Sequence, residues 1–392
     1  MSKKTVYKLV ILNNLVTPYR IPLYQGLGSR FSTYLLLSGK ESNRDTWTNL
    51  ESSLSNVHVR DVWGFTLQFF EKRRGKIFDP RYLHINPGYC WELLKIRPDA
   101  VISAEMGFRS LIALAYGFLF RRPVWILWGG TLLTEKNRSY LKRLLRQVIF
   151  RRVTRWISYG QTTTDYLLHL GVDRSYILQI QNCIDEGLYQ NDHLPVLRLS
   201  PSPTLLYAGQ FIKRKGVDLF LQAAKKLQQE GYHFSILLVG SGVEQEKLTQ
   251  IISQLNLKNI TVLPSQTPKQ MPAVYKSADV FVFPTLEEVW GLVVNEAIWS
   301  GLTVVSSIYA GCAEEILPHE NLFDPLDQDS FVCILRKAIM GELAAPTVNK
   351  LYTASQVVEM ISNELMGELT SKDDRTSQSI LLNTTAEGNT LT

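Results

Sequence analysis

Apolar residues in the first half of the chain fall into short runs that alternate with longer segments of helical periodicity. Predicted strands cover residues 9–13, 34–38, 100–103, 124–128 and 155–159, and predicted helices cover 19–31, 110–120, 136–150 and 163–170. Strands that alternate with helices are typical of a parallel sheet covered by helices on both faces. We therefore expect residues 1–195 to form one doubly wound α/β domain.

The periodic pattern stops at residues 196–203, where the segment Leu199-Ser200-Pro201-Ser202-Pro203 is typical of a linker. It then restarts, with predicted strands at 204–208, 234–239, 260–263, 279–283 and 302–306 and predicted helices at 217–230, 244–255 and 271–276. We therefore expect a second doubly wound domain at residues 204–348. Ligands are expected in the cleft between the two domains.

The end of the chain predicts one further helix followed by disorder. Residues 354–368 keep a helical period, so we expect a terminal helix within residues 349–369. Residues 370–392 are rich in Ser, Thr, Asp and Asn, a composition too polar to bury a core. We expect a disordered tail there.

The composition fits a two-domain protein of a reducing compartment. The chain has 392 residues, of which 45% are hydrophobic, enough for two buried cores. Its four cysteines show no paired spacing, which argues against a disulfide framework and against a zinc site. The apolar runs at 9–12 and 111–120 are too short for a signal sequence or a membrane span. We expect a cytoplasmic protein.

The net charge of +6 conceals an asymmetry between the two halves. Residues 1–200 contain 28 Lys and Arg against 15 Asp and Glu, whereas residues 201–392 contain 14 against 21. The first half is therefore expected to meet something anionic. No recognition motif accompanies the charge, so nucleic acid is a poor candidate, and an anionic membrane surface or a phosphorylated lipid acceptor fits better.

Residues 136–156 form a basic amphipathic segment that is a candidate for peripheral contact with such a membrane surface. The alternative is an ordinary surface helix that packs its Leu, Val and Ile side chains on the sheet. Both interpretations stay open.

The stretch at residues 284–297 carries the strongest chemical signal. An apolar run, 280–283, ends in a short acidic loop that contains Glu288, and Glu296 follows about two helical turns later. Open α/β sheets present ligand sites at the carboxyl ends of their strands, so both carboxylates can face one crevice. Carboxylates accept hydrogen bonds from hydroxyl groups, which predicts recognition of a sugar or a ribose.

This stretch resembles the Glu-x7-Glu signature of the retaining group 1 glycosyltransferases, family 4 of the GT-B fold. The family usually reads Glu-Gly-Phe-Gly-Leu, so Val289 departs from the common Gly, while Trp290 and Gly291 keep the aromatic-Gly pair. The resemblance implies two Rossmann-like domains that face a cleft, with a terminal helix that returns to the first domain. It also implies that Glu296 binds the ribose hydroxyls of a donor and that Glu288 lies near the donor sugar. For Glu288 we favour an electrostatic and positioning role over that of a nucleophile.

Residues 207–216 resemble the family's Gly-Arg-x4-Lys-Gly segment, which binds the donor pyrophosphate. Gly209 ends the strand and Lys215 falls on the family's Lys, but Gln210 stands where the family often has Arg. Lys213 or Arg214 is expected to compensate for the missing cation. A solvated basic turn is the plainer alternative.

Two backbone features complete the expected donor site. Gly240 and Gly242 match the family's Val-Gly-x-Gly turn beneath the nucleotide. The amides of Trp290, Gly291, Leu292 and Val293 are expected to point at the diphosphate from a helix N-terminus. We expect no metal and no cofactor besides the nucleoside diphosphate sugar, which is a co-substrate.

Acceptor residues are less determined. Arg20, after Pro18-Tyr19, is a candidate for contact with the acceptor or the donor phosphate, with a surface ion pair as the alternative. Gly129 stands where many family members have a histidine near the reacting sugar, so the resemblance names no general base in the first domain. Glu105 is a possible substitute.

The sequence thus predicts a retaining glycosyltransferase that moves a hexose from a nucleoside diphosphate sugar to a glycan or lipid-linked acceptor, as in the biosynthesis of cell-surface polysaccharides. Two alternatives remain. One is a nucleotide-sugar epimerase of the same fold, and the other is a non-catalytic subunit that binds nucleotide sugars.

Overall fold

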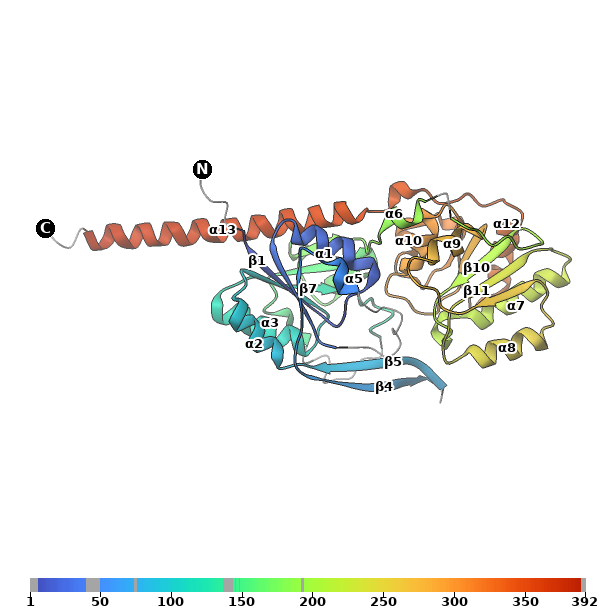
Figure 1. Cartoon of the computed structure of the whole chain (residues 1–392), viewed down its shortest axis with the longest axis horizontal. Helices are drawn as coiled ribbons and strands as arrows, with labels where there is room; N and C mark the ends of the chain where they lie inside the picture. The colour runs from blue at the N-terminus through green and yellow to red at the C-terminus, as the bar shows by residue number, and fades with distance from the viewer. Residues whose placement is uncertain are drawn as a thin grey trace.

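The computed structural model describes residues 6–39, 50–73, 76–136, 144, 146–147, 149–191 and 194–388. Two α/β halves lie side by side, and one long helix runs along the N-terminal half (Figure 1). Residues 194–203, between the halves, contain no helix or strand.

The described part of the N-terminal half is built on a parallel sheet of seven strands in the order β3-β2-β1-β6-β7-β8-β9. The strands are β1 (Lys8–Asn13), β2 (Ser32–Leu37), β3 (His58–Asp61), β6 (Ala100–Ala104), β7 (Val124–Trp128), β8 (Arg155–Tyr159) and β9 (Ile177–Ile180). The helices are α1 (Ile21–Gly28), α2 (Gly88–Ile96), α3 (Phe108–Phe120), α5 (Gly160–His169) and the short α6 (Glu186–Tyr189). The central strands β6 and β7 are buried along their whole length, as expected for parallel strands covered on both faces.

An antiparallel hairpin of β4 (Phe65–Arg73) and β5 (Lys76–Ile85) forms a separate two-stranded sheet. The apolar pattern did not predict β3, the hairpin or α2. For the hairpin the reason is physical, because the apolar side chains described on it face solvent instead of a core.

The C-terminal half has a six-stranded parallel sheet in the order β12-β11-β10-β13-β14-β15. Its strands are β10 (Thr204–Ala208), β11 (Ser235–Val239), β12 (Ile260–Leu263), β13 (Val280–Phe283), β14 (Thr303–Ser307) and β15 (Leu322–Phe323). Its helices are α7 (Val217–Gln229), α8 (Gln245–Gln254), α9 (Met271–Lys276), α10 (Leu292–Trp299), α11 (Ala313–Ile316) and α12 (Gln328–Ile339). Helix α7 buries Phe220, Leu221 and Ala224, which recur at the helical period. The predicted class of two doubly wound parallel-sheet domains is confirmed.

The terminal helix α13 (Ala354–Gly388) packs against α1 and the sheet of the N-terminal half. Glu364 pairs with Arg155 at 2.7 Å, and Glu368 accepts a hydrogen bond from the indole N–H of Trp125 at 2.6 Å. The helix continues through Gly388 and projects beyond the half that it contacts (Figure 1), although residues 370–392 were expected to be disordered. The physical reason is that residues 368–387 contain neither Pro nor Gly, so nothing in this stretch interrupts a helix that packing has already nucleated.

Nine of the 21 residues of the basic segment 136–156 lie outside the described residues, and three of the others are informative. Arg146 is turned inward, where it pairs with the buried Glu135 at 2.5 Å and donates to the Tyr166 hydroxyl at 2.9 Å. Ile149 and Trp156 are buried. The contacts of Arg146 and Ile149 favour a helix packed on the domain, one of the two alternatives that the sequence left open, whereas Trp156 belongs to strand β8. No helix in the described part of the chain has the length and apolar character to span a bilayer.

Candidate functional site

The two motif loops meet at the carboxyl edge of the C-terminal sheet. Strands β10 and β13 are parallel neighbours, so the loops that follow them, residues 209–216 and 284–291, leave the sheet on the same side. The Leu286 amide donates to the Arg214 carbonyl at 2.8 Å, and the Arg214 guanidinium donates to the Glu287 carbonyl at 2.7 Å. The sequence predicted both loops, and the structure brings them together.

Glu288 lies at the centre of a small charged cluster. Its Oε2 atom is 3.1 Å from Nη1 of Arg214 and also accepts a hydrogen bond from Nζ of Lys215. All three side chains are largely shielded from water, with 13–16% of their surface exposed. Burial by itself opposes ionisation of the carboxyl, but the two cations outweigh it and lower the pKa of Glu288 to about 2. Glu288 is therefore an anion at neutral pH.

Glu296 lies in different surroundings, two turns into α10. The Tyr275 hydroxyl donates to its Oε2 atom at 2.7 Å, and the Tyr189 hydroxyl acts on the same carboxyl. Burial raises the pKa of Glu296 to about 7, and the two hydroxyl groups offset only part of that effect. The two signature carboxylates therefore have separate partners, one charged and one neutral. Tyr189 comes from α6, the last helix before the segment that joins the halves.

Glycine is required where the strand-end loops of β10 and β11 pack backbone against backbone. A Cβ atom on Gly240 would lie 1.9 Å from the Gly209 carbonyl oxygen, and one on Gly242 would lie 2.4 Å from the Phe211 carbonyl oxygen. Two further hydrogen bonds join the loops, from the Gly209 amide to Val239 at 3.0 Å and from the Phe211 amide to Ser241 at 2.8 Å. These glycines fix the shape of the predicted nucleotide site, and their contact with a nucleotide stays a prediction.

Helix α10 begins at Gly291, whose φ of 104° favours glycine. Trp290, just before it, is fully buried and donates its indole N–H to Asn295 Oδ1 at 2.9 Å, so its side chain anchors the loop. The first-turn amides of Leu292 and Val293 follow, and amides at this position have no partner within their own helix. They form the kind of N-terminus that favours an anion.

The contacts of the basic loop, residues 209–216, distinguish the two candidates for the cation that is missing at Gln210. Lys213 pairs with Asp218 at 2.5 Å and is directed away from Glu288, whereas Arg214 and Lys215 both contact it. Gln210 itself contributes a backbone carbonyl, which accepts a hydrogen bond from Tyr207 at 2.9 Å. Arg214 and Lys215 are thus shielded from water, which contradicts the plainer interpretation as a solvated basic turn, and the role of Arg214 in binding a pyrophosphate stays a prediction.

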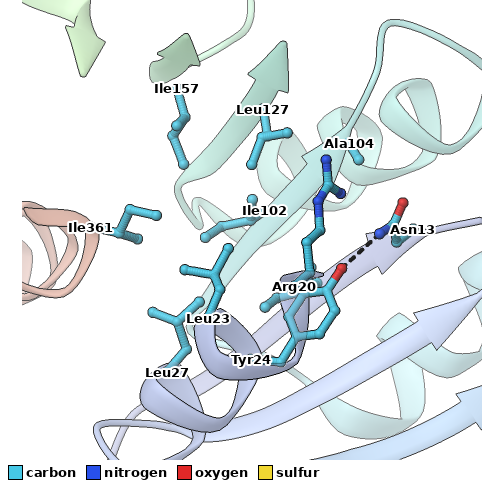
Figure 2. A pocket seen from close by; sticks show the side chains of 11 residues that line it. Asn13, Arg20, Leu23, Tyr24, Leu27, Ile102, Ala104, Leu127, Ile157 and Ile361 are labelled. Atoms are coloured by element: carbon cyan, nitrogen blue, oxygen red, sulfur yellow. Dashed lines mark hydrogen bonds between the residues drawn. The ribbon is translucent and has the colours of Figure 1, made fainter. Parts of the chain in front are cut away.

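Arg20 is enclosed by aromatic side chains. It donates to the Tyr159 hydroxyl at 2.8 Å and lies 5.9 Å from the ring centre of Tyr19. Among the described residues no carboxylate pairs with it. Figure 2 shows Arg20 beside a mainly apolar cavity of about 20 Å³, room for about one water molecule, at which Asn13 donates to Tyr24 at 2.7 Å.

Glu105 follows β6 in a left-handed conformation with φ of 70°, which is costly for a residue other than glycine. Its side chain is 61% exposed and pairs at 2.6 Å with Arg109, which is almost fully buried. Strained backbone often marks functional sites, and Glu105 lies at the carboxyl edge of the N-terminal sheet. It is thus an accessible, oriented carboxylate of the N-terminal half, and its contact with an acceptor stays a prediction.

Gly129 and Val289, the two departures from the family pattern, meet each other. A Cβ atom on Gly129 would lie 2.8 Å from Cγ1 of Val289 and 3.3 Å from the ring of Tyr159. The Val289 side chain therefore occupies the space beside Gly129, where a larger residue would need room. This contact joins the acceptor-side loop to the neighbour of Glu288.

Glu315 is a site-flanking residue that the sequence did not single out. Its Oε2 atom accepts a hydrogen bond from the Gln161 amide at 2.8 Å, at the N-terminus of α5, and its Oε1 atom accepts one from Gln181 at 3.0 Å. The C-terminal half thereby caps a helix of the N-terminal half. The acidic pair Glu314-Glu315 was visible in the sequence, but nothing distinguished it from ordinary surface acids.

Comparisons with known proteins agree with this geometry. Residues 192–355 match the family model described as glycosyl transferases group 1. The chain is 23% identical over 223 residues to the putative colanic acid biosynthesis glycosyltransferase WcaL of Escherichia coli, a match that covers 52% of each chain. It is 30% identical over 312 residues to the sulfoquinovosyl transferase SQD2 of Arabidopsis thaliana, covering 73% of this chain and 60% of that protein. The chain thus spans about half the length of WcaL and less than two thirds of SQD2.

Among solved structures, Anabaena Alr3699/HepE in complex with UDP matches with a TM-score of 0.65 at 17% identity, covering 95% of this chain and all of that one. This likeness shows the fold, and the predicted GT-B architecture is confirmed. Together the sequence matches support a likeness to the glycosyltransferase superfamily, which the family model shows for residues 192–355.

Proposed function

We propose that this chain is a retaining glycosyltransferase that moves a hexose from a nucleoside diphosphate sugar to a glycan or lipid-linked acceptor. The observation that carries the proposal is the shielded cluster of Glu288, Arg214 and Lys215 at adjoining strand ends. It lies inside the segment that matches the glycosyltransferase model. UDP-sugars are the first donor class to consider, because solved structures of this fold include complexes with UDP and with UDP-glucose.

Donor binding would exchange one anion for another at the basic loop. In the structure Arg214 and Lys215 both form ion pairs with Glu288. Both cations would contact the diphosphate instead when the donor binds. The first-turn amides of α10 would add partial positive charge on the same side. These groups would stabilise the charge that develops on the departing nucleoside diphosphate, and metal independence stays part of the proposal.

The bond changes proposed for the transfer balance without an added reactant. The bond between the sugar's anomeric carbon and the phosphate oxygen breaks, and a bond to the acceptor oxygen forms on the same face. The proton of the acceptor hydroxyl moves to the departing phosphate oxygen. Glu288, anionic at neutral pH, would stabilise the positive charge that develops on the sugar ring.

The remaining residues would bind and orient the two substrates. Glu296 would take hydrogen bonds from the ribose hydroxyls in place of Tyr275 and Tyr189. On the other side of the cleft, Arg20 and Glu105 would contact the acceptor, and Gly129 would let it approach the backbone.

The test begins with a thermal-shift panel of UDP-, GDP- and ADP-sugars on the whole chain, because a bound donor raises apparent stability. Glu296→Ala should lose donor binding, and Glu288→Ala should lose turnover more than binding. The anomeric configuration of the product, read by NMR, tests retention, and an inverted product would refute that part. Donor binding without hydrolysis or transfer would favour the non-catalytic alternative. Unchanged turnover in both variants would refute the site.

A further inference from the structure

The β4–β5 hairpin exposes an apolar face. The exposed fractions are 74% for Trp63, 52% for Phe65, 52% for Leu67 and 45% for Leu83. Phe65 and Leu67 lie two residues apart on β4 and therefore share a face, and Trp63 lies two residues before the strand. Leu67 is the cross-strand partner of Leu83, so the face extends onto β5. These four residues are called the hairpin apolar face below.

On the opposite face, at the base of the hairpin, the polar side chains of Thr66 and His84 are half-buried. Thr66 Oγ1 and His84 Nδ1 lie 2.7 Å apart, and Thr66 approaches the backbone at Gly39, just beyond β2. Asn86 holds the base of the hairpin through hydrogen bonds to the carbonyls of Ser38 at 2.8 Å and Val62 at 3.3 Å. In most antiparallel sheets the apolar face covers a core, so this hairpin has the reverse orientation.

The hairpin lies beside the candidate donor site. Its strands pair only with each other in the described sheets, and β5 contacts the 3₁₀ turn Lys213–Lys215 of the C-terminal half. Figure 1 shows it extending from the N-terminal half along the C-terminal half. A two-stranded hairpin that pairs with no other strand is only marginally stable in water. A surface that covers its exposed apolar side chains would therefore stabilise it.

The charge of the hairpin favours an anionic lipid surface over a protein partner. Strands β4 and β5 contain four Lys and Arg residues (Lys72, Arg73, Lys76, Arg81) against Glu71 and Asp79. The first half of the chain has the same excess of basic residues. Aromatic side chains such as Trp63 and Phe65 suit the boundary between lipid and water.

We propose that the hairpin apolar face docks on an anionic lipid bilayer and thereby holds the Lys213–Lys215 turn, which β5 contacts, close to the membrane. An acceptor carried on a lipid would then reach the candidate site from the bilayer. Only this last consequence depends on the proposed function, and the docking itself does not.

Vesicle co-sedimentation of the whole chain, without donor, tests the docking. The wild type should bind strongly to vesicles that contain both phosphatidylcholine and phosphatidylglycerol. It should bind much more weakly to vesicles of phosphatidylcholine alone. The triple variant Trp63→Ser, Phe65→Ser, Leu67→Ser should bind at least about tenfold more weakly, because each change removes apolar surface that lipid would cover. All three side chains are more than half exposed, so the variant should keep the wild-type unfolding temperature.

The matched control replaces exposed apolar residues of the C-terminal half, Val243→Ser, Leu326→Ser and Met340→Ser, which are 66%, 65% and 55% exposed. It should bind vesicles like the wild type. The proposal would be overturned if the hairpin triple variant bound vesicles as well as the wild type, or if the wild type bound neutral vesicles as well as anionic ones.

If the wild type does not bind vesicles but forms a concentration-dependent dimer that the triple variant loses, the face instead contacts a second copy of the chain. Hydrolysis of a soluble UDP-sugar should be unchanged in the triple variant, so the docking and the proposed function fail independently.

Discussion

The two halves of this molecule share one topology but differ in how the carboxyl edge of the sheet is built. In the C-terminal half the loops after β10 and β13 are hydrogen-bonded to each other, and they gather Arg214, Lys215 and Glu288 into one cluster. In the N-terminal half the corresponding loops hold Arg20 and Glu105 among separate partners, Tyr159 for one and Arg109 for the other.

The difference shows what each half is suited to do. A fixed cluster of charges suits a ligand of constant chemistry, such as a diphosphate, whose recognition needs cations at set positions. A dispersed set of groups beside an irregular hairpin suits a substrate that differs between enzymes of one fold. The contrast agrees with the proposal that the donor binds to the C-terminal half and the acceptor to the N-terminal half.

The largest expected effect concerns the charge of Glu288. Glu288→Gln keeps the shape of the side chain but leaves Arg214 and Lys215 without an anionic partner, and it removes the negative charge proposed to act on the sugar. We expect turnover to fall by about 10²–10³-fold, the usual cost of one electrostatic group, measured as kcat on a UDP-sugar. Glu314→Gln, a change of an exposed acid nearby, is the control and should keep wild-type kcat. If kcat of Glu288→Gln falls by less than about threefold, the charge of Glu288 does not contribute to the mechanism as proposed.

The second prediction uses the opposite pKa shifts of the two signature carboxylates. The pKa of Glu296 is raised from 4.5 to about 7, so the folded state holds this proton more tightly than the unfolded chain does. Glu296 therefore lowers stability as pH rises from about 4.5 to 7, by roughly 1–3 kcal/mol above pH 7. Glu296→Gln should gain stability relative to wild type between about pH 5 and pH 8, measured by urea unfolding.

Glu288 supplies the control for that measurement. Its pKa is lowered from 4.5 to about 2, so its contribution to stability is present above about pH 4.5 and is lost only as pH falls toward 2. The difference in stability between Glu288→Gln and wild type should therefore stay constant from about pH 5.5 to pH 8. A parallel pH dependence in both variants would contradict the contrast between the two surroundings.

Sequence reasoning performed unequally on the two halves for the same physical reason. The donor side was predicted because its chemistry follows two buried strands in contiguous loops, 209–216 and 284–296, and parallel neighbours bring such loops to one edge. Arg214 was left as one of two choices, since only the fold decides that Lys213 turns to Asp218. The separate partners of Glu288 and Glu296 were also beyond the sequence, because Tyr189 and Tyr275 are distant in the chain.

On the acceptor side the decisive features arise from tertiary contact. The hairpin was not predicted from the apolar pattern, and Glu315 is an ordinary acid until α5 is placed against it. The extended α13 was missed because a polar composition was given more weight than the absence of helix-breaking residues.

The third prediction concerns the joint between the halves. Glu315→Ala removes the carboxylate that caps α5 at the Gln161 amide and that also accepts from Gln181. Loss of a capping side chain typically costs about 1 kcal/mol, so we expect a stability loss of that size in urea unfolding. The matched variant Glu314→Ala should change stability by less than about 0.5 kcal/mol. Equal stabilities of the two variants would show that the halves are not joined through this carboxylate.

The smallest expected effect concerns the contact between Gly129 and Val289, where the two halves meet beside Glu288. Gly129→Ala would place a methyl group 2.8 Å from Cγ1 of Val289, so the loops must separate slightly, and kcat/KM should fall by about two- to fivefold. Val289→Ala should cost little alone and should restore most of the loss in the double variant, because it vacates the space that the new methyl group needs. The measurement is a double-mutant cycle on kcat/KM, with an expected coupling of about 0.5–1 kcal/mol. If the effects of the two substitutions on kcat/KM are additive, the loops that contain Gly129 and Val289 act independently. The contact between the two halves at this point would then have no part in turnover.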